Sequence, residues 1–402
     1  MIADIVRERG PLTVAAFMDL ALYHPELGYY ARAARRSGRA GDFFTSVDVG
    51  PLFGELLAIQ IAEMAGLLAS APLRSASSAS SASSSGFDLV EAGAGSGRLA
   101  ADVLSALRRS DPDLLGRLRL ALVEASPAAR AAQAETLCGI FDRPFASSES
   151  PPDGIEGVVF ANELLDAFPV HQVVMRAGGL KEVYVECRAE LSRADLSGPP
   201  RLRLREGPPS TPALAQYLER LHIELEPGWR AEINLRAVEW IRDVARRLRR
   251  GFLLLVDYGH EAPDLYGASH SAGTLTSFTR HTSGTPAEDA SVPPWLEHPG
   301  DQDITAHVDF TSVRAAAEAE GLTTIGFLDQ TYFILGLIAA EGRPTLSGSA
   351  ADADRTPSLR ERLALKTLLM PGGLGSTMKV LIFGKDVGAP ALRGCSYRVR
   401  VT

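Results

Sequence analysis

From Phe87 onward, short apolar runs alternate with stretches of helical periodicity. This alternation predicts a parallel sheet whose strands are joined by crossover helices. The apolar runs are almost continuously aliphatic, which is typical of strands covered on both faces. The expected strands are Phe87–Glu91, Leu118–Glu124, Gly157–Ala161, Phe252–Asp257 and Lys379–Phe383. The pattern therefore predicts an α/β fold of the Rossmann-like kind.

The chain before this alternation has a different pattern. Residues 1–68 combine helical periodicity with turn residues, and a helix is expected over Pro51–Leu68, so we predict an N-terminal helical cap or lobe. Residues 69–86 are rich in Ser and Ala, whose small side chains bury too little surface to offset the entropy of ordering them. We expect a low-complexity Ser/Ala loop there.

Two further segments interrupt the predicted core. Leu180–Cys187 alternates in polarity and is expected to run antiparallel to Pro169–Met175. Residues 264–303 show little periodicity and are too long for a passive connection, so we predict a lid or substrate segment. The core then comprises residues 87–263 and 304–402. The length of 402 residues leaves open one large domain with insertions or a catalytic domain with a second lobe.

The turn after the first predicted strand has the pattern of a nucleotide-binding loop, because the residues from Glu91 to Gly97 join that strand to a helix expected over Arg98–Arg109. Glycines permit unusual backbone angles and a close approach of ligand to backbone. The spacing Glu-x-Gly-x-Gly-x-Gly is closer to that of S-adenosylmethionine-dependent methyltransferases than to the dinucleotide pattern Gly-x-Gly-x-x-Gly. An ordinary strand-to-helix turn is the alternative. The predicted cofactor contacts here are Glu91, Gly93, Ala94, Gly95 and Gly97.

Two more strand ends carry polar residues. Glu124 ends the second strand, where a carboxylate can accept both ribose hydroxyls of the cofactor. Its alternative role is to cap the helix that begins at Ser126-Pro127. The third strand is followed by Asn162, Glu163, Asp166 and His171, and reactive groups in open α/β sheets gather beyond strand carboxyl ends. Helix capping or surface placement is an equal alternative for each of these residues.

Composition narrows the function classes. Hydrophobic residues make up 46% of the chain, as in folded globular proteins, and the net charge of −8 disfavours nucleic acid as a partner. The three cysteines lack C-x-x-C spacing, so the sequence predicts no metal site and favours a reducing compartment. The first residues are unlike a secretory signal or transit peptide, and no apolar run has the length of a bilayer span. We therefore expect a cytoplasmic protein without membrane insertion.

Several blocks of sequence carry a resemblance to a known family. They are His24–Tyr30, Gly41–Ser46, Pro51–Leu57, Ala161–His171, Val256–His260, Gly273–Leu275, Asp303–Phe310 and Leu369–Pro371. With them the chain resembles the MidA family over nearly its whole length. The resemblance implies a class I methyltransferase that uses S-adenosyl-L-methionine and methylates arginine in a protein substrate, which for the mitochondrial member is a subunit of respiratory complex I. Substrate identity stays open, as does homodimer formation.

Methyl transfer from a sulfonium is a direct displacement, so the protein has to align the nucleophile and remove water from it. A guanidinium stays protonated, and carboxylates must orient it, which makes Glu163 and Asp166 the expected catalytic acids. His260 is the expected late proton acceptor, with His307 as an alternative and a structural role as another for both.

A polar turn near the N-terminus is also expected at the cofactor. Asp42, Thr45 and Ser46 precede an apolar helix, and we predict that they fold over the cofactor, with helix capping as the alternative. Asn162 is expected to contact it as well. Two other functions remain open: an assembly factor, non-catalytic or weakly catalytic, that binds a respiratory subunit, and a dehydrogenase, which the glycine spacing disfavours.

Overall fold

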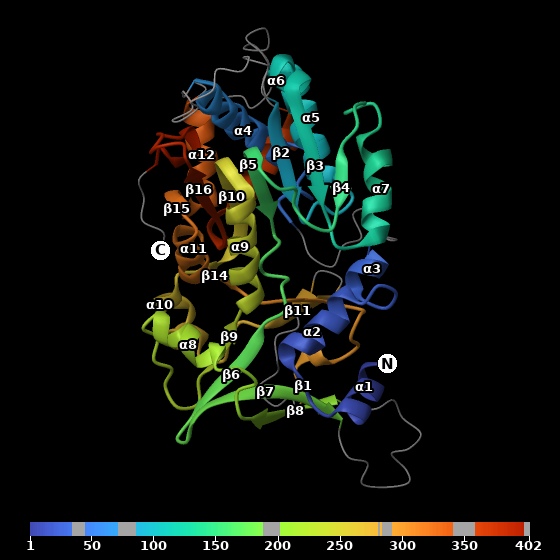
Figure 1. The fold of residues 1–402 in the computed structure, drawn as a ribbon, viewed down its shortest axis with the longest axis vertical. Helices are drawn as coiled ribbons and strands as arrows, with labels where there is room; N and C mark the ends of the chain where they lie inside the picture. The colour runs from blue at the N-terminus through green and yellow to red at the C-terminus, as the bar shows by residue number, and fades with distance from the viewer. Residues whose placement is uncertain are drawn as a thin grey trace. The chain divides into compact units, whose positions relative to one another are not determined.

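The computed structural model describes residues 1–33, 45–70, 86–187, 202–279, 282–283, 292–340 and 358–397 (Figure 1). The α-helices are α1 (Ile2–Arg9), α2 (Val14–Tyr23), α3 (Tyr29–Ala33), α4 (Leu52–Ser70), α5 (Arg98–Ser110), α6 (Pro112–Arg117), α7 (Pro127–Leu137), α8 (Ala213–Arg220), α9 (Leu235–Arg247), α10 (Ala262–Leu265), α11 (Phe310–Ala319), α12 (Gln330–Ala340), α13 (Leu359–Leu369) and α14 (Leu374–Thr377). Short 3-10 helices are η3 (Ala268–His270), η4 (Pro294–Leu296) and η6 (Arg393–Cys395).

The strands of the described segments form three sheets. They are β1 (Leu12–Thr13), β2 (Phe87–Ala92), β3 (Leu118–Val123), β4 (Ala146–Ser148), β5 (Ile155–Asn162), β6 (His171–Arg176), β7 (Gly179–Cys187), β8 (Leu202–Gly207), β9 (Arg230–Ile233), β10 (Leu248–His260), β11 (Thr276–Thr279), β12 (Thr282–Ser283), β13 (Asp303–Thr305), β14 (Val308–Asp309), β15 (Thr323–Asp329) and β16 (Met378–Lys385).

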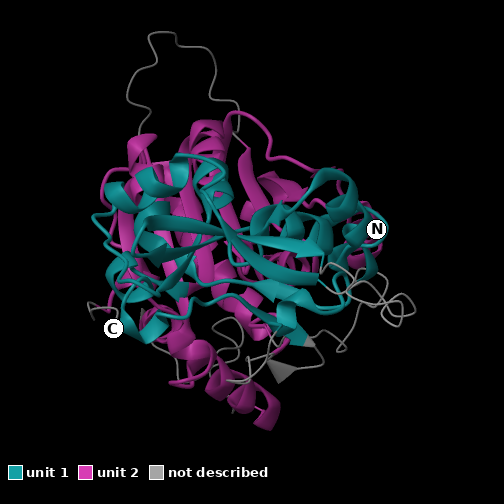
Figure 2. Ribbon diagram, turned by 90° about the horizontal axis from the view of Figure 1, so that it is seen from below, with its two compact units in different colours: residues 1–43, 165–240, 259–313 teal, residues 44–164, 241–258, 314–402 magenta. Residues whose placement is uncertain are grey.

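Internal contacts divide the chain into two units, coloured in Figure 2. Unit 1 comprises residues 1–43, 165–240 and 259–313, and unit 2 comprises residues 44–164, 241–258 and 314–402. This grouping differs from the division expected from the sequence. The helices of the predicted N-terminal cap belong to both units, because α1 to α3 lie in unit 1 and α4 lies in unit 2. Most of the predicted Ser/Ala loop lies outside the described residues.

Unit 2 is built on the predicted Rossmann-like sheet, with the strand order β15-β16-β10-β5-β2-β3-β4. The strands β4, β3, β2, β5 and β10 run parallel to one another, whereas β16 runs antiparallel to both β10 and β15. All five predicted strands are present. The strands β2, β3 and β5 are buried along most of their length, which explains their aliphatic sequence.

The expectation that no apolar run has the length of a bilayer span is wrong for helix α4 of unit 2. By length and composition alone this helix could cross a membrane, which is weak evidence for a span. It packs on α5 and β5, and its buried residues include Phe53, Leu56 and Ile61. A Cβ on Gly54 would lie 2.5 Å from Cβ of Asp102 in α5, so glycine allows the two helices to approach closely here. Its burial in unit 2 therefore accounts for its apolar composition.

Unit 1 is built on an antiparallel sheet in the order β1-β7-β6-β9, with β8 paired to β7. The predicted pairing of β6 with β7 is present. Helices α1 and α2 pack on this sheet. The predicted lid segment contributes to the same core, because Trp295 and Leu296 are buried in one cluster with Phe17 and Val174. Its described part also supplies β11 and β12 of a small third sheet, so it is an integral part of unit 1.

Candidate functional site

The order of strands in unit 2 reverses between β2 and β5. Along the chain β3 and β4 add on one side of β2, whereas β5 and β10 add on the other. Ligands of open α/β sheets bind outside the carboxyl ends of the strands at such a reversal. The glycine loop leaves the carboxyl end of β2, and Asn162 and Glu163 leave that of β5. The topology therefore brings two of the predicted site segments to one edge of the sheet.

The glycine loop has the backbone that its sequence predicts. Gly93, Gly95 and Gly97 have φ of 71°, 51° and 84°, a region that favours glycine. The N–H groups of Gly93 and Ala94 both donate to the carbonyl of Val123, at 2.9 and 3.0 Å. These bonds fix the loop against the end of the neighbouring strand β3.

The three glycines differ in what surrounds them. A Cβ on Gly93 would stand 3.0 Å from Cδ1 of Leu164, and a Cβ on Gly97 would stand 3.1 Å from Cδ1 of Leu122. A Cβ on Gly95 would meet nothing within 4 Å. The outer glycines thus allow the loop to pack against its own unit, and the middle one faces open space where a ligand can approach.

Glu124 binds the loop directly. Its carboxylate accepts hydrogen bonds from the backbone N–H of Gly95 at 2.9 Å and from that of Ser126 at 2.7 Å. The hydroxyl of Ser126 itself caps helix α7 by accepting from Ala129. A carboxylate has about four acceptor positions, so two remain for the ribose hydroxyls of a cofactor. Ser126 therefore has the capping role that was the alternative for Glu124, and the cofactor role of Glu124 stays a prediction.

Glu91 lies under the loop. Its side chain is buried, and its carboxyl accepts from the backbone N–H of Ala100 in α5 at 3.0 Å. Burial raises the pKa of Glu91 well above its ordinary value of 4.5, against the opposing effect of that hydrogen bond. The carboxyl ties β2 to α5. Its predicted contact with the cofactor stays a prediction.

The raised pKa of Glu91 has a consequence for stability. Above pH 4.5 the unfolded chain releases the Glu91 proton before the folded chain does, so this group lowers the free energy of unfolding as pH rises toward the folded pKa. Each unit of raised pKa costs about 1.4 kcal/mol once that range is passed. Glu91→Gln keeps the acceptor for Ala100. We expect the Tm difference between this variant and wild type to be more favourable to the variant at pH 8 than at pH 5, by at least about 2–4 °C. The exposed Glu135→Gln is the control, and a parallel pH profile for all three proteins would contradict the argument.

Asn162 and Glu163 form a constrained turn. Glu163 has a positive φ of 50°, which is uncommon for a residue with a side chain and is found preferentially at functional sites. Its backbone N–H donates to the carbonyl of Val256 at 2.8 Å, and the next N–H, of Leu164, donates to the buried carboxylate of Asp257 at 3.1 Å. The neighbouring strand β10 therefore holds this turn in its unusual conformation.

The side chains of this turn face one another. Oε1 of Glu163 accepts from the amide of Asn162 at 3.0 Å and from the backbone N–H of Ser46 at 3.4 Å. Oδ1 of Asn162 is buried and has no hydrogen-bond partner among the described residues. A buried acceptor without a donor costs free energy, and such groups mark ligand sites. Asn162 is thus suited to accept from a donor on a bound cofactor.

The predicted N-terminal turn is anchored in unit 2. The hydroxyl of Ser46 is buried and donates to Oε1 of Gln330 at 3.0 Å. Thr45 donates to Asp48, and Asp48 pairs with Arg98 at 2.9 Å, at the first residue after the glycine loop. The turn therefore lies beside the loop, as a cofactor role requires, and that role stays a prediction. Asp42 lies outside the described residues.

Gln330 contacts the predicted N-terminal turn, and the sequence did not indicate this contact. Its amide donates to the carbonyl of Leu368 at 3.2 Å, which leaves Oε1 to accept from Ser46. It follows the last residue of β15 and is fully buried. A polar residue directly after a strand was the only signal available, because the partner segments are remote in sequence.

The other two predicted catalytic residues belong to unit 1. Asp166 is buried, and its backbone carbonyl accepts from the N–H of Ala306 at 3.0 Å. His260 ends strand β10, and its ring lies 4.7 Å from that of His270 and 5.2 Å from that of His307, between centroids. His171, also noted in the sequence, pairs with the buried Glu182 at 2.8 Å, which indicates a structural role.

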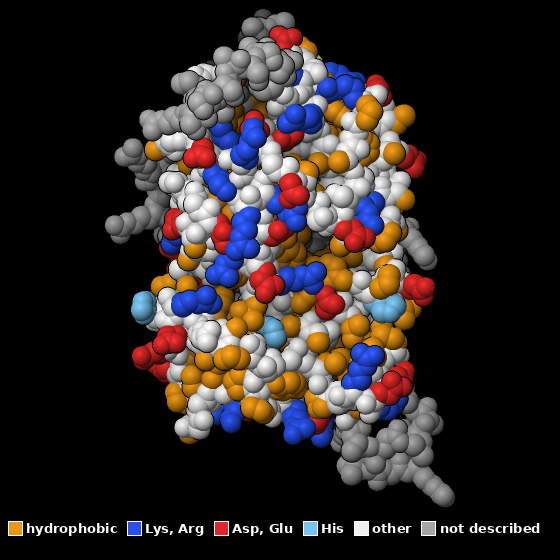
Figure 3. Space-filling view, in the orientation of Figure 1, with side chains coloured by type: hydrophobic (Ala, Val, Ile, Leu, Met, Phe, Trp, Pro, Cys, Tyr) orange, Lys and Arg blue, Asp and Glu red, His pale blue; other side chains and the backbone are white. Residues whose placement is uncertain are grey.

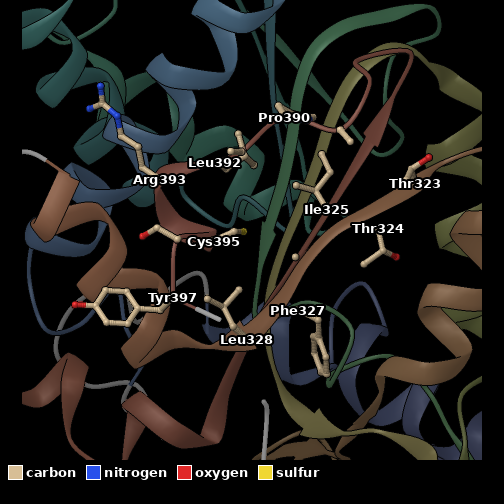
Figure 4. A pocket seen from close by; sticks show the side chains of 14 residues that line it. Thr323, Thr324, Ile325, Phe327, Leu328, Pro390, Leu392, Arg393, Cys395 and Tyr397 are labelled. Carbon is tan, nitrogen blue, oxygen red and sulfur yellow. The ribbon is translucent and has the colours of Figure 1, made fainter. Parts of the chain in front are cut away.

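A cavity of about 760 Å³ in unit 2 lies elsewhere, between β15 and the segment 389–397 (Figure 4). Its lining contains none of the predicted site residues. Cys395 is its only thiol, and burial raises the pKa of this thiol to about 12, so it stays protonated and is a poor nucleophile. The cavity therefore does not replace the loop region as the candidate site.

The residues around the glycine loop fit S-adenosyl-L-methionine. The loop is open at Gly95, Glu124 has acceptor positions left for ribose, and Asn162 presents a buried acceptor without a donor. Acidic and basic side chains are interspersed on the molecular face of Figure 3.

Comparisons with known proteins agree with this fit. Residues 56–328 match a family model described as "Putative S-adenosyl-L-methionine-dependent methyltransferase". A crystal structure of a COG1565 superfamily member and likely methyl transferase from Burkholderia thailandensis, bound to S-adenosyl-homocysteine, is 28% identical with a TM-score of 0.76. The likeness covers 98% of this chain and 92% of that one.

Curated relatives are named protein arginine methyltransferase NDUFAF7, mitochondrial. The protein from Danio rerio is 29% identical over 90% of this chain and 80% of its own length. The protein from Homo sapiens is 28% identical over 89% of this chain and 76% of its own length. These names correct one expectation: the cytoplasmic location expected from the first residues is wrong, since the relatives are named mitochondrial.

The match to the family model extends over most of the chain and includes the glycine loop, Glu124 and the turn at Glu163. The fold and the bound S-adenosyl-homocysteine of the Burkholderia protein agree with it. The chain belongs to the family of S-adenosyl-L-methionine-dependent methyltransferases.

Proposed function

We propose that this methyltransferase transfers the methyl group to an arginine side chain of a protein. The observation that carries the proposal is Glu163, a carboxylate held in a strained turn beside the glycine loop. A guanidinium needs an acidic partner to orient it, and strain of this kind is kept where it serves function. The names of the relatives, which specify protein arginine methylation, support the same substrate class.

The chemistry divides between the cofactor and the chain. Bound S-adenosyl-L-methionine supplies a methyl group on a positively charged sulfur. In the proposal Glu163 accepts hydrogen bonds from the guanidinium and directs one nitrogen toward the methyl group. Asp166 is proposed as the second acid, and His260 as the group that accepts the proton released late in the reaction. Gly93, Ala94, Gly95, Gly97, Glu124, Asn162, Thr45 and Ser46 are the proposed cofactor contacts.

For the identity of the protein substrate we propose a subunit of respiratory complex I, as the resemblance to the MidA family implies. Homodimer formation stays open, and the division into a core, a cap and a lid stays a prediction.

The substrate class can be tested directly. We expect the purified chain, supplied with isotopically labelled S-adenosyl-L-methionine, to label polypeptides in an extract of cells that lack this protein. Mass spectrometry of the labelled peptides should place the methyl group on arginine nitrogen. A synthetic peptide with the identified sequence should be a substrate, and the same peptide with the arginine changed to lysine should not be.

The outcomes separate the competing functions. Label on lysine, on a carboxylate or on a small molecule would contradict arginine specificity while leaving the methyltransferase assignment intact. Binding of S-adenosyl-homocysteine together with stable capture of one polypeptide, and no label in it, would favour the assembly-factor function.

A further inference from the structure

Three histidines meet in unit 1, although they come from three different segments. His260 ends β10, His270 ends η3, and His307 lies between β13 and β14. One ring nitrogen of each lies within 4.8 Å of one ring nitrogen of both others. All three side chains are partly buried. Such a convergence of imidazoles, with no carboxylate or cysteine in the group, is the donor set that suits zinc and its neighbours among the transition metals.

The backbone that carries these rings is firmly placed within unit 1. Strand β10 pairs with β14 at Gly259 and Val308, where a Cβ on Gly259 would stand 2.1 Å from the carbonyl oxygen of Val308. The N–H of His307 donates to the hydroxyl oxygen of Thr274 at 3.1 Å. Thr274 in turn donates, through its own N–H, to the buried carboxylate of Glu232 at 2.7 Å. The close packing at Gly259 therefore fixes β10 against β14, and the hydrogen bonds from His307 to Thr274 and from Thr274 to Glu232 fix the segment that carries His307.

The hydrogen bonds of His270 leave one nitrogen for a ligand. Its Nδ1 lies 2.9 Å from the backbone carbonyl oxygen of Asp264, which can only accept, so Nδ1 carries the proton. In the neutral ring Nε2 then has the free lone pair. Metal-binding histidines usually donate their second ring N–H to a carbonyl or carboxylate in this way.

We propose that His260, His270 and His307 together bind one zinc ion, with a fourth position left for water or for a donor atom of a bound molecule. Three protein nitrogens with one open position is a common arrangement of zinc in proteins. Zn–N bonds of about 2.0–2.1 Å place the nitrogens roughly 3.3 Å apart, so small ring rotations would close the site. The sequence predicted no metal site because its cysteines lack the spacing of a metal-binding motif. The three histidines are remote from one another in sequence, and only the fold brings them together.

This site bears on the role of His260. An imidazole whose lone pair is bound to a metal cannot also accept a proton, so zinc binding at these residues would exclude His260 as the proton acceptor proposed above. The inference goes beyond the methyltransferase function and does not depend on it.

The test uses the full chain without a histidine tag, stripped of metal by a chelator that is then removed. Calorimetric titration with zinc chloride should show one saturable site per chain. Cobalt(II), titrated as a spectroscopic probe, should give the intense visible bands of four-coordinate binding. We expect His270→Asn to weaken zinc binding by at least about 100-fold, because one of three protein ligands is lost.

His222→Asn is the matched control, since His222 is exposed, belongs to the same unit and lies outside the group. It should bind zinc as tightly as wild type. We expect His270→Asn to keep its affinity for S-adenosyl-homocysteine, which involves unit 2, and its circular dichroism spectrum. Both results would show that the variant is folded. If His270→Asn does not fold, His260→Asn serves as the second variant. Wild-type affinity in the folded variant, or no saturable site in wild type, would overturn the proposal.

Discussion

Replacing Glu163 by glutamine is expected to lower kcat/KM for methyl transfer by about 10- to 150-fold and to leave the affinity for S-adenosyl-homocysteine within about twofold of wild type. Glutamine keeps the oxygen that accepts from Asn162 and from the N–H of Ser46, so the turn should persist. It loses the negative charge that orients the guanidinium. A hydrogen bond to a charged group contributes about 1.5–3 kcal/mol, and 3 kcal/mol corresponds to roughly 150-fold in rate.

Transfer would be followed by isotopic label on the arginine peptide, and cofactor affinity by calorimetry. The control is Glu149→Gln, which removes the charge of an exposed acid of the same unit that pairs with Arg130. It should behave as wild type in both assays. Wild-type transfer in Glu163→Gln would remove this carboxylate from the mechanism, and a loss of cofactor affinity would reassign it to the cofactor.

Glu124→Gln is expected to weaken cofactor binding while leaving methyl transfer at saturating cofactor largely intact, the reverse of the effect expected for Glu163→Gln. We expect its dissociation constant for S-adenosyl-homocysteine to rise about 10- to 100-fold, because one charged acceptor of the ribose hydroxyls is lost. The amide NH₂ also turns a donor toward the N–H of Gly95 or that of Ser126, which both need an acceptor. Transfer should recover substantially at saturating cofactor, since the proposed arginine-orienting residues are untouched.

Calorimetry over a range of cofactor concentrations, combined with label transfer at saturation, checks this result. Glu149→Gln again serves as the control, because Glu149 directly follows β4, the neighbour of β3 in the sheet. An unchanged dissociation constant in Glu124→Gln would mean that Glu124 only supports the loop and the start of α7.

The sheet of unit 2 was predictable because its strands are buried on both faces and therefore have continuous aliphatic sequences. Strand β4 escaped prediction, as it has three residues and is largely exposed. The grouping of helices into the two units has no local signal in the sequence. Helices α2 and α4 are both apolar, and only long-range packing, on β6 and β7 for α2 and on α5 for α4, assigns them to different units.

In the candidate site, too, the residues with a local sequence pattern were predictable and those placed by long-range contacts were not. The glycines and Glu124 lie directly after predicted strands, and a local pattern was sufficient to find them. Gln330 and His270 lie far from their partners in sequence, so no spacing indicates them. The strained φ of Glu163 was equally invisible, because the hydrogen bonds that hold it come from strand β10.

The apolar sequence of α4 also matters while the chain is being made. Helix α4 is complete before any residue of α5 or β5 has been synthesised, and those are elements on which it packs in the finished protein. At about 5–20 residues per second, the ribosome needs on the order of ten seconds to deliver β5. During that interval the apolar residues of α4 have neither α5 nor β5 to pack on, so the folding of this helix into unit 2 has to wait for chain that is synthesised later.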